Sequence, residues 1–89
     1  MKIGTVVKSR AGRDKEGWFV VLEMDGDFAI IADGKSRPTG RPKRKRKKHL
    51  MVTNTVLETA DYATNRVLKK SLSKFGVDVE KEGNDLGKG

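Results

Sequence analysis

The chain has 89 residues, 35% of them hydrophobic, and a formal net charge of +8. A chain of this length forms one domain with a small core and has little apolar surface to spare for a deep pocket, so we do not expect an enzyme. It has no cysteine, which excludes disulfides and thiolate metal sites. The longest apolar runs have four or five residues, too few for a signal peptide or a membrane span, so the cytosol is the expected location.

Several short strands are predicted in the first half of the chain. Residues 3–7 are rich in β-branched side chains and predict the first strand. A second strand is expected at 18–24, and the Asp25–Gly26 pair predicts a tight hairpin into a third strand at 27–33. Residues 49–53 predict a short closing strand. Strands joined by short glycine-containing turns indicate a small antiparallel sheet that closes on itself as a barrel.

The second predicted strand contains two neighbouring aromatic residues, Trp18 and Phe19. Adjacent side chains of a strand point to opposite faces, so we expect one ring in the core and the other partly exposed. The exposed ring could stack on a nucleic-acid base, but packing is the preferred interpretation because small barrels need bulky aromatic side chains inside. Tyr62 is expected to pack where the following helix meets the barrel.

The excess positive charge lies in residues 35–48, which contain nine Lys or Arg and no Asp or Glu. The other 75 residues therefore sum to +8 − 9 = −1. Residues 34–42 contain Pro38, Gly40 and Pro42 and predict an irregular loop, whereas 43–48 is an unbroken run of six cations that we expect along the sheet edge. A localised cation cluster on a nearly neutral body is typical of a polyanion-binding protein, with nucleic acid the leading partner.

A helix is predicted after the sheet. Thr55 and Glu58 form a capping-box pattern, apolar residues then recur at helical spacing as far as Phe75, and Gly76 is expected to end the helix. The helical cations Arg66, Lys70 and Lys74 either contact phosphate or, as we prefer, line the solvent face. The expected organisation is a barrel with its basic loop over 1–53, a helix over 54–76 and a disordered tail over 77–89.

The order of these segments resembles a KOW motif, in which one glycine turns the chain between two strands of an SH3-like barrel. The segments that carry the resemblance are residues 4–7 (GTVV), 11–15 (AGRDK) and 19–22 (FVVL), followed by 28–31 (FAII), Thr39-Gly40, the basic run and His49-Leu50. The whole order is similar to the KOW-type large-subunit ribosomal proteins of archaea and eukaryotes, the fourteen-e group, and to their stand-alone bacterial relatives. The chain departs from them in its longer Lys/Arg run and its acidic, glycine-rich tail.

The resemblance implies a mainly β fold, an SH3-like barrel with a C-terminal helix, that binds ribosomal RNA of the large subunit. It implies that Gly12 is the motif glycine and that the loop around it approaches RNA. Combined with the charge pattern, it gives these expected RNA contacts: Arg10, Gly12, Arg13, Lys15, Lys35, Arg37, Arg41, Lys43, Arg44, Lys45, Arg46, Lys47, Lys48 and His49. His49 either donates to phosphate or simply lies on its strand. Ribosomal proteins are possible further partners, and no metal, cofactor, membrane or small-molecule substrate is expected.

The function predicted from the sequence is therefore RNA binding without chemistry. Because like charges repel, the basic loop is expected to be mobile in the free protein and fixed when bound. Two alternatives remain: a protein-interaction module that uses the basic loop to dock an acidic surface, and an accessory of transcription elongation.

Overall fold

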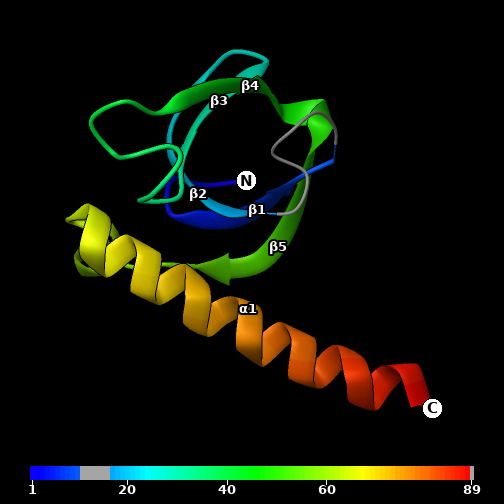
Figure 1. Ribbon diagram of the computed structural model, residues 1–89. Helices are drawn as coiled ribbons and strands as arrows, with labels where there is room; N and C mark the ends of the chain where they lie inside the picture. Colours follow the sequence, from blue (N-terminus) through cyan, green and yellow to red (C-terminus); the bar gives the residue numbers. More distant parts are fainter. Residues whose placement is uncertain (11–16, 89) are drawn as a thin grey trace.

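A computed structural model describes residues 1–10 and 17–88, with side chains as far as residue 77. These residues form a curled antiparallel sheet with a long C-terminal helix outside it (Figure 1). The elements in chain order are β1 (Thr5–Ser9), β2 (Trp18–Asp25), β3 (Phe28–Ala32), β4 (Lys43–Arg46), the 3-10 helix η1 (Lys47–His49), β5 (Leu50–Val56), the 3-10 helix η2 (Thr59–Tyr62) and α1 (Asn65–Lys88). The predicted mainly β class with one C-terminal helix is confirmed.

The sheet has the strand order β4-β3-β2-β1-β5, so β4 and β5 are its two edges. The predicted hairpin between β2 and β3 is present, and the final strand pairs with β1. Closure of the barrel was predicted, but β4 and β5 do not pair with each other. The reason is that β4 has only four residues and passes into η1, which turns the chain toward β1 before β5 begins.

The two faces of the sheet form two separate parts of the core. The inner, concave face buries one cluster of side chains: Val7, Phe19, Val21, Ala29, Ile31 and Leu50. On the outer face, Leu68 and Leu72 of α1 cover a second cluster formed by Val6, Val20 and Ala32. The alternation predicted for β2 is confirmed for residues 18–22, whose neighbours join different clusters, but a register shift between Val21 and Glu23 interrupts it further along the strand.

The aromatic residues lie as the alternation predicts. Phe19 is buried in the inner cluster, whereas Trp18 is half-buried on the outer side. Its ring meets the ring of Phe75 edge to face, with centroids 4.9 Å apart. Tyr62 packs against the same outer cluster, which confirms its expected place between helix and sheet. These contacts fix α1 across one end of the outer face.

The predicted boundaries of the helix were wrong at both ends. Thr55 belongs to β5, and the capping box present is formed by Glu58 and Asp61 of the short helix η2. Helix α1 begins at Asn65, and the preceding Thr64 caps it by accepting a hydrogen bond from the Val67 N–H through its hydroxyl oxygen, at 3.2 Å. Thr55 stays in the strand because pairing of β5 with β1 extends to Val56, and its own N–H donates a 3.2 Å hydrogen bond to Oγ1 of Thr53.

Gly76 does not end the helix, which continues to Lys88. A Cβ atom at this position would lie 3.3 Å from both Cδ1 and Nε1 of Trp18, so the glycine permits close packing of the helix on the indole. The flexibility predicted for residues 77–89 stays a prediction.

In the part of the chain that the structure describes, no helix has the length and apolar character needed to span a bilayer.

Candidate nucleic-acid interface

The basic run forms an edge strand and a turn. Residues 43–46 make up β4, and antiparallel pairing places Arg46 opposite Phe28 and Arg44 opposite Ile30 of β3. The position predicted for the run, along the sheet edge, is confirmed. In the structure residues 43–46 pair with β3, and the mobility expected before RNA binds stays a prediction. Their charges alternate between the two faces of the strand, which lowers the mutual repulsion.

The alternation divides the cations of β4 into two pairs. Arg44 and Arg46 are exposed on the outer face, whereas Lys43 and Lys45 are half-buried. The Lys45 ammonium donates a 2.6 Å hydrogen bond to Oγ of Ser9, which is only 2% exposed on β1. Lys43 also interacts within the protein. Both lysines were expected to contact RNA; the structure shows them half-buried with partners within the protein, and their contact with RNA stays a prediction.

Phe28 lies beneath the two outward arginines. The guanidinium carbons of Arg44 and Arg46 lie 3.9 and 5.0 Å from its ring centroid. Such cation–π contacts are worth about 0.5–1 kcal/mol at exposed sites. They hold the two guanidinium groups in place, so less side-chain entropy remains to be lost when these groups bind a ligand.

Asp25, at the end of β2, places a carboxylate beside these arginines. Its Oδ2 lies 3.2 Å from a terminal nitrogen of Arg44, and the two side chains are 67% and 56% exposed. An exposed pair of this kind contributes about 0–1 kcal/mol. A phosphate that binds Arg44 therefore competes with Asp25 at small cost.

Removing this competitor is expected to tighten RNA binding. In Asp25→Asn the guanidinium of Arg44 no longer has to leave a carboxylate, so we expect affinity to rise about two- to fivefold, as the energy of an exposed ion pair allows. Fluorescence anisotropy with a labelled structured RNA measures the change. Glu23→Gln removes the same charge from the same strand and is the control. Equal gains in both variants would show that only net charge matters.

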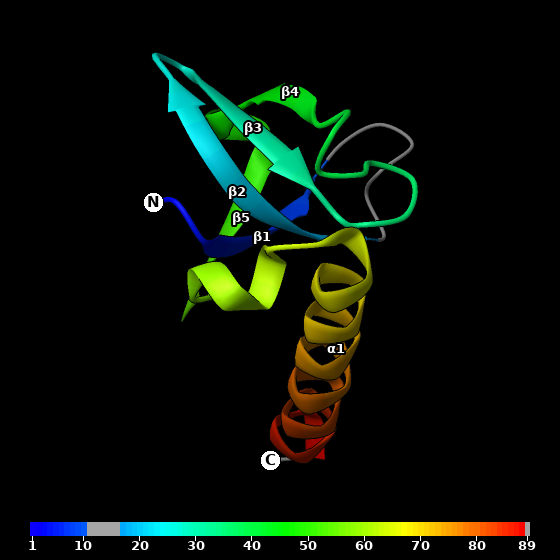
Figure 2. The ribbon, with the colours of Figure 1, turned by 90° about the vertical axis from the view of Figure 1, so that its left-hand side faces the viewer.

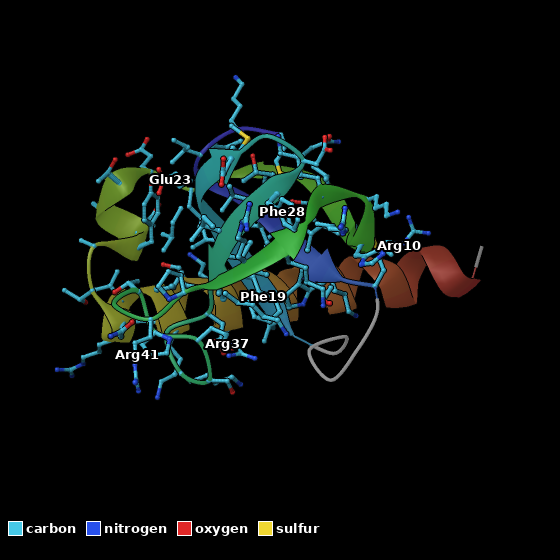
Figure 3. The ribbon with its side chains drawn as sticks, turned by 90° about the horizontal axis from the view of Figure 1, so that it is seen from above. Arg10, Phe19, Glu23, Phe28, Arg37 and Arg41 are labelled. Atoms are coloured by element: carbon cyan, nitrogen blue, oxygen red, sulfur yellow. The ribbon has the colours of Figure 1, made fainter. Side chains whose placement is uncertain are left out.

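The loop between β3 and β4 is folded around Asp33. This carboxylate is buried, and its Oδ1 accepts hydrogen bonds from the backbone N–H groups of Lys35 and Arg37, at 2.9 and 2.8 Å. The side chains of Lys35 and Arg41 are exposed, whereas Arg37 is half-buried and engaged within the protein. Figure 3 shows Arg37 and Arg41 together beyond one end of β4.

Arg10 lies beyond the other end of β4 (Figure 3). Its backbone N–H donates a 2.7 Å hydrogen bond to the carbonyl of His49, which brings the end of β1 to η1. In η1 the Lys48 side chain is exposed, and Lys47 and His49 are half-buried. The other expected contacts of this region, Gly12, Arg13 and Lys15, lie outside the described residues.

Five of the nine cations in residues 35–48 are therefore exposed. They are Lys35, Arg41, Arg44, Arg46 and Lys48, and they form a row along β4 and beyond both its ends. Arg10 is also exposed, and its hydrogen bond to His49 places it at one end of this row. The sequence did not point to Phe28 or Asp25 as parts of this surface, since both lie outside the acid-free segment. The signal that could have pointed to them is the tight turn after Asp25, because the hairpin it forms pairs Asp25 with Phe28.

Within the described residues, no group of His, Asp and Glu side chains lies together in a way that could hold a metal ion. The chain matches no protein-family model, and the search of curated proteins found no match. The site is an edge strand that presents two arginines on an aromatic ring, in a row of further exposed cations.

Proposed function

We propose that the protein binds structured RNA through the five exposed cations of residues 35–48. The observation that carries this proposal is their arrangement on a folded support. Arg44 and Arg46 project from the outer face of β4, and exposed cations continue the row at both ends of the strand. Helix α1 covers a different part of the outer face, against Val20 and Ala32, and leaves this row open.

The proposed mechanism is electrostatic binding without chemistry. Each guanidinium of Arg44 and Arg46 can donate two parallel hydrogen bonds to phosphate oxygens, whereas Lys35 and Lys48 act as point charges. Because β4 is already paired with β3, binding requires little ordering of the backbone.

RNA is preferred to duplex DNA because of the shape of the support. A small curled sheet presents an edge and loops, which suit irregular folded RNA. Helix α1 buries its apolar residues Leu68 and Leu72 on the sheet, so it is not a free recognition helix. Ribosomal RNA is the specific partner implied by the KOW resemblance, and we retain it as part of the proposal.

The salt dependence of binding tests this function. If the five exposed cations each reach a phosphate, they should contribute about −4 to the slope of the logarithm of the association constant against the logarithm of salt concentration. Gel-shift titrations of the wild-type protein against structured ribosomal RNA, from low to high potassium chloride, measure it. A flat salt response, or salt-resistant capture of an acidic protein after nuclease treatment, would reject RNA binding in favour of a protein-interaction module.

A further inference from the structure

A second positively charged site lies between α1 and the loop that follows β3. An open groove of about 610 Å³ lies there, and its lining includes Trp18, Asp33, Lys35, Arg66, Lys69 and Lys70. Figure 2 shows the first turns of α1 beside this loop, and in Figure 1 the same loop leads into β4. The volume is within the range of sites that hold small ligands.

The two walls of the groove are fixed to each other. The backbone N–H of Thr39 donates a 2.6 Å hydrogen bond to Oδ1 of Asn65, the first residue of α1. Gly34 lies so close to the helix that a Cβ atom there would be 2.5 Å from the carbonyl oxygen of Asn65. The groove is therefore formed before any ligand arrives.

The charge of the groove favours an anion. Four cations line it, Lys35, Arg66, Lys69 and Lys70, against the single carboxylate of Asp33 among its lining residues, giving +4 − 1 = +3. That carboxylate is buried, and the loop backbone already donates two hydrogen bonds to it. Arg66, Lys69 and Lys70 occur at three- and four-residue spacing on one side of α1, which directs them to the same groove.

Trp18 gives the groove a flat apolar wall beside these charges. The indole is half-buried, supported by Phe75 from α1, and the ammonium of Lys8 lies 5.2 Å from its ring centroid. An aromatic surface next to several cations is the combination that binds single-stranded nucleic acid, by stacking on bases and neutralising phosphates.

We propose that this groove binds one nucleotide of an unpaired RNA segment, with its phosphate at Arg66, Lys69 and Lys70 and its base against Trp18. This inference rests on the proposed function and adds a site for a single-stranded part of the same RNA. On this proposal Arg66 and Lys70 contact phosphate, in place of the preferred interpretation that they only line the solvent face. Lys74 lies outside the groove, in a separate hollow that Asp61 borders, and is not part of the site.

Trp18 provides the readout, because it is the only tryptophan in the chain. We expect its fluorescence to be quenched when the protein is titrated with a structured RNA that carries a single-stranded end. In Lys69→Gln/Lys70→Gln, both exposed positions, the quenching at saturation should fall by at least half and the affinity several-fold. Lys74→Gln removes one charge from the same helix outside the groove, so it serves as a control and should keep the quenching.

The two proposals fail in different ways. Arg44→Gln/Arg46→Gln should weaken the affinity for RNA but reach the full quenching at saturation, because these residues lie on β4. If RNA binds in the gel shift and Trp18 fluorescence does not change, or if the Lys69→Gln/Lys70→Gln variant keeps full quenching, the groove is not a nucleotide site. If no RNA binds at all, the proposed function itself is wrong.

Discussion

Changing Arg44 and Arg46 together to Gln is expected to weaken RNA binding roughly 10- to 100-fold at low salt, because two charge-assisted hydrogen-bonding groups are lost. The slope of the salt dependence should become less negative by about 1.5 to 2, as two fewer counterions are released. Both side chains are exposed, so the fold should be retained. Fluorescence anisotropy over a series of potassium chloride concentrations measures both quantities.

The matched control removes the same charge from the same strand. Lys43→Gln/Lys45→Gln also takes away two cations, but from the half-buried side of β4. We expect its affinity for RNA to stay within about threefold of wild type, while its unfolding free energy falls by about 1–3 kcal/mol because the bond between Lys45 and buried Ser9 is lost. Equal losses of affinity in both pairs would mean that net charge, and not the outer face of β4, determines binding.

The oligomeric state of the Arg44→Gln/Arg46→Gln variant has to be measured together with its affinity for RNA. Charged side chains on an edge strand prevent pairing with another chain. The Arg44→Gln/Arg46→Gln variant should therefore be compared with wild type by sedimentation at the concentration of the binding assay. A charge-keeping variant, Arg44→Lys/Arg46→Lys, tests whether the planar guanidinium groups themselves contribute; we expect an intermediate affinity.

Gly34→Ala is expected to destabilise the protein by about 2–4 kcal/mol. Gly34 has φ +83°, a backbone conformation that costs an L-residue about 1–2 kcal/mol. The added Cβ would also lie 2.5 Å from the carbonyl oxygen of Asn65 and 3.1 Å from the backbone nitrogen of Lys69. Both are backbone atoms, so relief requires the loop to move away from α1. Urea unfolding followed by circular dichroism measures the loss.

The same loop offers a control for this substitution. Gly40 is exposed, has no positive φ, and a Cβ there would meet nothing within 4 Å. Gly40→Ala should leave stability unchanged or raise it by about 0.4–1 kcal/mol, through a less flexible unfolded chain. If Gly34→Ala behaved like Gly40→Ala, the contact between loop and helix that forms the groove would be absent in solution.

The strands could be predicted because their signals are local. The continuous apolar runs 18–22 and 28–32, with a glycine turn between them, predict both strands, and the two-residue period of a strand places neighbouring side chains on opposite faces as far as the bulge after Val21. The helix start could not be predicted in this way, because Thr55 and Thr64 both offer a capping hydroxyl. Pairing between β1 and β5, which joins residues far apart in the chain, keeps Thr55 in a strand. The helix therefore begins after Thr64, whose hydroxyl caps it.

By itself, the sequence determined the mainly β class, the faces of the apolar residues in 18–22 and 28–32, and the position of the positive charge, since these follow from the order and type of neighbouring residues. Only the tertiary structure decided which cations face solvent. The register of β4 against β3 places Arg44 and Arg46 over Phe28 and turns Lys45 to Ser9, and the hairpin brings Asp25 to Arg44. The groove likewise forms only when α1 packs on the sheet, because its lining residues come from three separate segments, within 17–18, 33–35 and 66–73. Such contacts depend on pairing and packing across the chain, which local composition does not specify.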